Sequence, residues 1–177
     1  ELAAATLEGF TVTEDMLGNY SQTTYGRTAP SRSSEETPDG LYHLHFVPKK
    51  LTREVSAVLH IEGLNNIRSA TCRLGGVAES IFLATGKTSA NTVTQEFTPS
   101  NPEFSPGSPF NGTLSCEFEI FGLNVIDNNN LHLDALLVDG KTEFEGDCTN
   151  VKITENGDGT GSVTLILEAS TEKVPDV

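Results

Sequence analysis

The stretch "LTREVSAVLHIEG", Leu51 to Gly63, decides the fold class. Apolar and polar side chains alternate along it, with Val55, Ala57, Leu59 and Ile61 on one face and Glu54, Ser56 and His60 on the other. Successive side chains of a β-strand point to opposite faces, whereas a helix would repeat its apolar positions every three or four residues. The period of two therefore predicts a strand with one buried face.

Similar strand candidates occur on both sides of this stretch. One precedes it, "LYHLHFVP" from Leu41, and the others come after it: "SATCRL", "SIFLAT", "TVTQEFT", "GTLSCEFEIFG", "LHLDALLV", "NVKIT" and "GSVTLILEA". Segments rich in Gly, Pro, Asn and Asp separate them, including "GGVAE" between the second and third candidates. About nine short strands at hairpin-like spacing, without a long amphipathic helix, predict an all-β fold. We expect a two-sheet antiparallel β-sandwich.

The beginning of the chain has a different composition. Residues 19–40, "NYSQTTYGRTAPSRSSEETPDG", are polar and rich in Ser, Thr and Pro, as in a long surface loop or a loosely attached arm. We divide the chain into an N-terminal segment with a polar connector or arm, residues 1–40, and a β-sandwich domain, residues 41–177. The chain starts without Met or a signal peptide, so we interpret it as a mature product or a fragment.

The charge balance excludes two classes of partner. Among 177 residues, eleven basic side chains stand against twenty-five acidic ones, for a formal net charge of −14. Such a surface repels phosphate backbones and anionic lipid headgroups. We therefore expect no nucleic-acid partner and no binding to a membrane surface. No stretch has the apolar length of a membrane span.

The three cysteines are widely spaced, which excludes a zinc ribbon. Cys72 shares strand parity with Ala70 and Leu74, and Cys116 shares it with Leu114 and Phe118, so both are predicted to point inward. Two buried free thiols are favoured over a disulfide between them, which stays an alternative. Cys148 is predicted to be more exposed.

"FLATGKTS", Phe82 to Ser89, ends like a phosphate-binding loop. Such a loop needs Gly five positions before the second Gly, where this chain has Ile81, and it opens a helix. Here a strand enters a turn, so Thr85, Gly86 and Lys87 predict a hairpin bend and no nucleotide site.

"NGDGTGSV" matches half of an EF-hand calcium loop through Asn156, Asp158 and Thr160. The twelfth position, which needs a bidentate Glu, is Leu167, and the flanking segments read as strands. A Gly-rich hairpin turn is the favoured interpretation.

The histidines are the remaining metal candidates. His43 and His45 lie on one strand face and could share a metal if His60 or an acid joined them, but solvent-side histidines are the favoured interpretation. His132 has the same interpretation. We therefore predict no metal-binding, cofactor-binding or catalytic residue and no cofactor.

Catalysis has little support in the sequence. There is no Gly-x-Ser-x-Gly elbow of the kind that holds a nucleophilic serine. Paired carboxylates for sugar hydrolysis stay an alternative, since Glu117 and Glu119 are present. As an alternative to a structural role, a glycan-binding surface module would use exposed aromatic rings such as Tyr20, Tyr25 or Tyr42.

The block "VSAVLHIEGLNNIRSATCRLGGVAESIFLATGKTS", Val55 to Ser89, resembles the fimbrillin-like surface lipoproteins of the Bacteroidales. The later stretches "GTLSCEFEIFGL" and "LHLDALLVDGKT" are similar to segments of the same family, so that the resemblance covers about Leu41 to Ala169. It implies a transthyretin-like sandwich and a lipid-anchored precursor exported to the cell envelope. Precursors of this family usually carry a signal peptide, a lipidated Cys and an N-terminal domain, and this chain shows none of these, so the resemblance fits the C-terminal domain of the family.

The resemblance also implies a role. The family suggests a non-enzymatic cell-surface structural or adhesion module, similar to a pilus subunit, anchored in the outer membrane or exposed outside the cell. Its partners would be surface proteins or other pilus subunits, with glycans as the alternative. No catalytic residue carries over, because the family motif contains none.

Overall fold

The computed structural model describes residues 2–7, 9–11, 45–124, 129–157 and 163–177. The chain divides into two units, one formed by Glu1–Ala3 with Lys50–Val177 and the other by Ala4–Lys49. The short strands β1 (Ala3–Ala4) and β2 (Lys49–Lys50) form a two-stranded sheet. Of the expected strand "LYHLHFVP", residues 45–48 are irregular and residues 41–44 lie outside the described residues.

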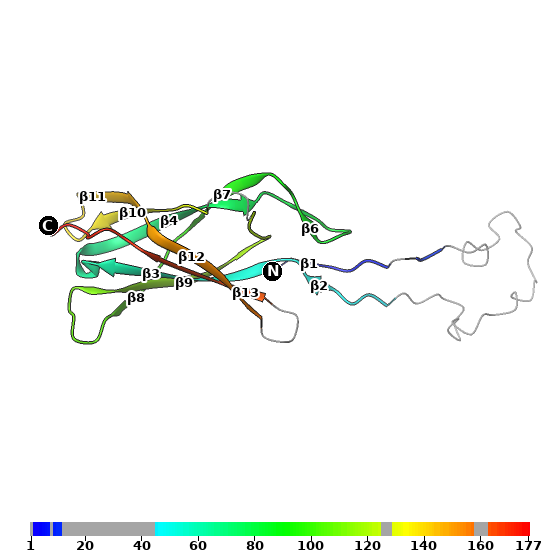
Figure 1. Cartoon of the computed structure of the whole chain (residues 1–177), viewed down its shortest axis with the longest axis horizontal. Coiled ribbons are helices and arrows are strands. Elements are labelled where there is room, and N and C mark those ends of the chain that lie inside the picture. Colours follow the sequence, from blue (N-terminus) through cyan, green and yellow to red (C-terminus); the bar gives the residue numbers. More distant parts are fainter. Residues whose placement is uncertain (1, 8, 12–44, 125–128, 158–162) are drawn as a thin grey trace, which may run out of the picture. The chain divides into compact units, whose positions relative to one another are not determined.

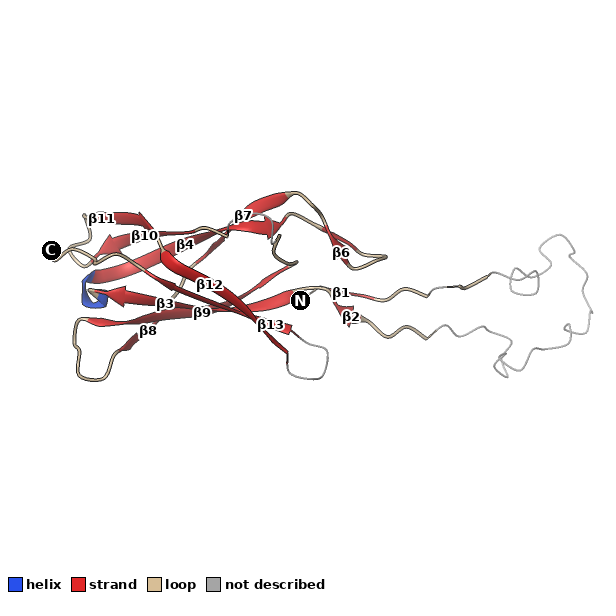
Figure 2. Cartoon of the chain, viewed as in Figure 1, coloured by secondary structure: helices blue, strands red, loops and turns tan. Residues whose placement is uncertain are grey.

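The larger unit is an all-β sandwich (Figures 1 and 2). The four-stranded sheet has the order β11 (Glu143–Asp147), β10 (Leu131–Leu137), β4 (Ile67–Ala78) and β7 (Thr92–Phe97). The five-stranded sheet has the order β12 (Thr149–Gly157), β13 (Val163–Ser170), β3 (Arg53–Glu62), β9 (Asn111–Ile120) and β8 (Asn101–Phe104). A hairpin of β5 (Ile81–Phe82) and β6 (Lys87–Thr88) and one 3-10 turn, η1 (Leu64–Asn66), complete the elements.

Inward-facing side chains of both sheets form one apolar core, as the alternation predicts. The five-stranded sheet contributes the inner face of β3, where Val55, Ala57, Leu59 and Ile61 are all buried. The four-stranded sheet contributes Cys72 and Leu74 from β4 and every second residue of β10: Leu131, Leu133, Ala135 and Leu137. The rings of Phe97 and Phe118 stack between the sheets with centroids 4.4 Å apart. The predicted strand faces are therefore confirmed for the strands that carry the core.

The expectation of a wholly antiparallel sandwich is wrong for one pairing. β13 runs parallel to β3, with Leu165 opposite Val55 and Leu167 opposite Ala57, whereas the other pairings in the two main sheets are antiparallel. The antiparallel pair of β12 and β13 adds to β3 on the side opposite β9, with β13 next to β3 and β12 at the edge of the sheet. Alternation along a strand reports which face is buried but carries no information about the direction of its neighbour.

The predicted break at "GGVAE" is also wrong. β4 continues through Gly75 and Gly76 to Ala78, and its register against β7 shifts between Leu74 and Val77. Gly76 has φ +76°, a conformation that L side chains rarely adopt, so the glycine pair forms a β-bulge inside one strand. The strand continues because Val77 and Ala78 still find partners in β7.

Two strands of the main sheets, β8 and β11, were not foreseen. β8 lies in "SNPEFSPGSPFNG", which reads as a turn, and it carries Pro102 at the edge of the sheet, where a missing N–H is tolerated. β11 has a short, mostly polar sequence, "EFEGD", that gave no strand signal of its own. Its pairing with β10 places acidic residues at the site described next.

Candidate functional site

A row of ionisable side chains lies on the outer face of the four-stranded sheet. On β10, His132 and Asp134 alternate with the buried residues Leu131 and Leu133, so both point away from the core. The antiparallel register of β11 places Asp147 opposite His132 and Glu145 opposite Asp134. Residues 15 positions apart (His132 and Asp147) and 11 positions apart (Asp134 and Glu145) in the chain are thereby direct cross-strand neighbours.

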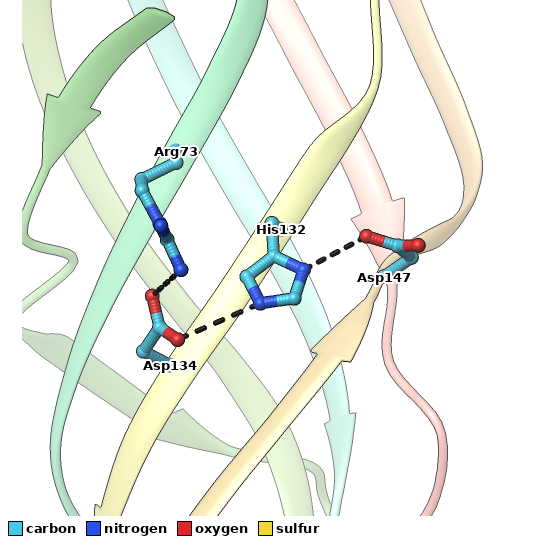
Figure 3. A network of polar contacts seen from close by, with 4 residues as sticks. All are labelled: Arg73, His132, Asp134 and Asp147. Atoms are coloured by element: carbon cyan, nitrogen blue, oxygen red, sulfur yellow. Dashed lines mark hydrogen bonds and ion pairs between the residues drawn. The ribbon is translucent and has the colours of Figure 1, made fainter.

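The imidazole of His132 lies between two carboxylates (Figure 3). Its Nδ1 is 2.8 Å from Oδ1 of Asp147, and its Nε2 is 3.5 Å from Oδ1 of Asp134. The His132 side chain is 27% exposed. Because a carboxylate accepts hydrogen bonds, Nδ1 is the donor to Asp147, and this bond fixes the orientation of the ring.

Arg73, on the neighbouring strand β4, extends the network. It is the register partner of His132, and its Nη2 lies 2.7 Å from Oδ2 of Asp134 (Figure 3). Asp134 is thus held from two sides, by the guanidinium at one carboxylate oxygen and by the imidazole at the other. Surface ion pairs of this kind contribute little to stability on their own, about 0 to 1 kcal/mol. The network therefore fixes the positions of these side chains but adds little to the free energy of folding.

The network borders two shallow surface hollows. One, of about 210 Å³, is lined by Asp134 and Glu145 among others, and the second, of about 260 Å³, by Arg73, His132 and Asp147 among others. One nitrogen or oxygen atom from each of His132, Asp134 and Glu145 lies within 4.8 Å of the other two. Three potential ligand atoms therefore converge at a solvent-accessible point.

A larger hollow, of about 520 Å³, opens at one end of the sandwich. Apolar side chains from the ends of β4, β7 and β9 line much of it: Val77, Ala78, Val93 and Ile120. Along the inner face of β7, exposure rises from 7% at Phe97 to 41% at Val93. The interior of the sandwich is therefore closed at Phe97 and partly open at Val93.

The rim of this end hollow carries a charged pair. Glu119 accepts a hydrogen bond from Thr52 at 3.0 Å and pairs with Nζ of Lys50 at 2.8 Å. The hydrogen bonds from Lys50 and Thr52 lower the pKa of Glu119. Glu117 also lies on the outer face of β9, since residues 114 and 120 of this strand are buried.

The two predicted hairpins are confirmed where the structure describes them. In "FLATGKTS", β5 pairs with β6, Gly86 has φ +67°, and its N–H donates to the carbonyl of Phe82 at 2.7 Å. In "NGDGTGSV", the flanking segments form the antiparallel pair β12 and β13, as a hairpin requires. Asp158, Thr160 and Gly161 lie outside the described residues.

The histidine candidates do not converge in the described residues. His43 lies outside them, His45 is exposed in an irregular segment, and His60 is exposed on the outer face of β3 opposite Thr113. The structure instead brings His132 together with acids. The signal that could have found this cluster is the alternation of His132 and Asp134 before the tight turn "DGKT", followed by Glu143, Glu145 and Asp147 at the same spacing.

The cysteines are free thiols. Cys72 is buried as predicted, Cys116 is half-buried against the core, and Cys148 is also half-buried against the core rather than exposed. Burial raises the pKa of Cys72 and Cys116, and it raises the pKa of Cys148 to about 11. Because the thiolate is the reactive form, these side chains behave as small apolar core residues.

No protein family, curated protein or solved structure matches this chain in the comparisons with known proteins. Across the described residues, no helix is both long enough and apolar enough to cross a lipid bilayer. The rings proposed for glycan contact, Tyr20, Tyr25 and Tyr42, lie outside the described residues.

Proposed function

We propose that this protein is a non-enzymatic structural or adhesion module of the cell surface, similar to a pilus subunit and exported to the cell envelope. Its partners are surface proteins or other subunits of the same assembly. The observation that carries the proposal is the end hollow beside β7. There, the inner-face residue Val93 is 41% exposed on a strand that forms the edge of its sheet, beside the buried apolar residues Val77 and Ala78.

Edge strands are natural attachment points for extended segments. A segment laid along β7 can continue the sheet through main-chain hydrogen bonds, which supply affinity without a demanding sequence. The inward side chains of such a segment would cover Val93 and the neighbouring apolar wall of the hollow. Burial of apolar surface contributes about 25 cal/mol for each Å², so coverage of this wall would add to the affinity that the main-chain hydrogen bonds supply.

The rest of the sandwich suits a load-carrying role at an exposed surface. One continuous apolar core joins both sheets, so the unit resists deformation as a whole. The net charge of −14 keeps such a surface soluble and discourages nonspecific self-association. Charged residues also occur on the other edges, including Glu103 on β8 and Glu143 on β11, and charge discourages uncontrolled strand pairing there.

A site-specific cross-linking experiment in the native cells tests the proposal. A photoreactive residue at position 93 should capture envelope proteins or further copies of the chain. The same residue at position 138 should capture none, because Val138 is at least as exposed as Val93, at 49% against 41%, but lies in the turn after β10. Protease added to intact cells should cleave the protein. Protection of the chain inside intact cells, or equal capture from both positions, would contradict the proposal.

A further inference from the structure

We propose that the outer face of the four-stranded sheet carries a binding site for a divalent transition-metal ion, formed by His132, Asp134 and Glu145. The ligand atoms are Nε2 of His132, Oδ1 of Asp134 and a carboxylate oxygen of Glu145. One potential ligand atom from each of these three residues lies within 4.8 Å of the other two, on two adjacent strands. This site is independent of the proposed function, which rests on the end hollow and the edge strand β7.

A hydrogen bond at Nδ1 of His132 favours metal binding at the other ring nitrogen, Nε2. Metal-bound histidines usually donate their other ring N–H to a carboxylate, which orients the ring and makes the bound nitrogen more basic. Asp147 occupies this position, with its Oδ1 2.8 Å from Nδ1 of His132. The bond directs Nε2 toward Asp134, which is where the ion would lie. Asp147 therefore acts as a positioning residue and not as a ligand.

The spacing of the first two ligand atoms already fits a metal ion. In a tetrahedral site with bonds of about 2.0 to 2.1 Å, two ligand atoms lie about 3.3 Å apart. Nε2 of His132 and Oδ1 of Asp134 are 3.5 Å apart. Glu145 is exposed, so rotation of its side chain can bring its carboxylate inward by the remaining ångström or so.

The local charge also suits a dication. Arg73 binds Oδ2 of Asp134 at 2.7 Å and leaves Oδ1 to face the imidazole. With His132 neutral, the three carboxylates of Asp134, Glu145 and Asp147 exceed this one guanidinium by two negative charges. A bound divalent ion would balance that excess. This arrangement differs from a purely acidic patch, because the nitrogen ligand and its oriented ring are part of it.

The donor set indicates which ions bind. An imidazole nitrogen suits Zn²⁺, Cu²⁺ and Ni²⁺, whereas Mg²⁺ and Ca²⁺ prefer sites made of oxygen ligands alone. Three protein ligands on one exposed sheet face leave a further coordination position open toward the shallow hollow beside Asp134 and Glu145. We expect Zn²⁺ to bind with one ion per chain and water in the open position.

Titration calorimetry of the full chain with zinc chloride, after treatment with a chelator, tests the site. Wild type should bind one Zn²⁺, and His132→Gln should weaken this binding at least about tenfold. Asp147→Ala should weaken it by about tenfold while leaving the three ligands in place. The matched control is His60→Gln, since His60 is an exposed histidine at a strand position of the other sheet and should leave zinc affinity unchanged.

Two further readings decide between this site and nonspecific binding. The ¹⁵N resonance of His132 Nε2 should shift on zinc addition, and thermal unfolding should show that each variant remains folded. Zinc binding that survives His132→Gln, or that His60→Gln weakens equally, overturns the proposal. So does Ca²⁺ binding of the same affinity at the same residues, because that result would identify a surface of carboxylates without a role for the imidazole.

Discussion

At the residue scale, Asp139 sets the turn that builds the site. Its Oδ1 accepts hydrogen bonds from the backbone N–H groups of Lys141 and Thr142, each at 2.9 Å, and its Oδ2 accepts one from the Thr142 hydroxyl at 2.6 Å. Gly140, with φ +68°, supplies the conformation that the turn requires. This turn joins β10 to β11, so its geometry helps to determine which residue of β11 lies opposite His132.

The same contacts predict a pH dependence. The hydrogen bonds from Thr142 and Lys141 favour the ionised carboxylate and lower the pKa of Asp139 in the folded protein below its value of 3.8 in a free chain. A depressed folded pKa contributes stability above the unfolded pKa, and this contribution is lost as the pH falls through the folded pKa. Asp139→Ala should therefore be less stable than wild type near neutral pH, with a smaller difference in strong acid.

Carboxyl NMR titration and urea unfolding at several pH values measure these two effects. The Asp139 titration midpoint should lie below 3.8. Glu172→Ala provides a control, because it removes an exposed carboxylate outside this turn. A stability difference between Asp139→Ala and wild type that stays constant from neutral to strongly acidic pH would show that ionisation of Asp139 has no part in the turn.

At the scale of elements, the attachment of β8 to β9 depends on a missing side chain. A Cβ added at Gly112 would lie 2.2 Å from the carbonyl oxygen of Glu103 and 2.9 Å from Cα of Phe104. Both of these atoms belong to the backbone of β8, which cannot rotate away as a side chain can. The close approach allows this four-residue strand to pair at the edge of the five-stranded sheet.

Gly112→Ala should destabilise the protein by about 1 to 3 kcal/mol, because the inserted methyl group forces β8 away from β9. Gly157→Ala is the matched control: Gly157 also lies in a strand, and an added Cβ there would meet nothing within 4 Å. Urea unfolding gives the free energies, and hydrogen exchange should show faster exchange in residues 101–104 of the Gly112 variant. Equal stability of the two variants would contradict the close packing.

At the scale of the whole molecule, the two sheets are held together by one shared core. Leu133, on the central strand β10, is 1% exposed and belongs to a cluster with residues of β3, β9 and β13. No described cysteine forms a disulfide, so apolar burial between the sheets provides most of the stabilisation within the described residues. Loss of packing at this position should weaken both sheets together.

Leu133→Ala is expected to lower the free energy of unfolding by about 2 to 5 kcal/mol, from lost apolar burial and the cavity left behind. Leu83→Ala removes the same atoms from a side chain that is 56% exposed, and it should change stability by less than about 0.5 kcal/mol. Urea denaturation of both variants and wild type measures the difference. A similar, small effect of the two substitutions would be incompatible with a common core around Leu133.

Features of the site that depend on neighbouring residues in the chain could be predicted from the sequence, and features that depend on strand pairing could not. His132 and Asp134 could be placed on one strand face from their spacing, and the turn after them pointed to the acids of residues 143–147, but nothing in the sequence grouped them with Arg73. The hairpin around Gly86 was predictable because its turn chemistry is local. The strand β11 was not, because its few polar residues become a strand only through pairing with β10.

By itself, the sequence determined an all-β chain, the buried face of β3, the inward direction of Cys72 and Cys116, and the turn at Gly86. Each of these depends on side-chain alternation or backbone preference within a few residues, and such patterns are local. Only the tertiary structure decided the parallel pairing of β13 with β3, the bulge at Gly75 and Gly76, and the meeting of His132 with Asp147. These features depend on which strands become neighbours, and that choice is made by burial across the whole core.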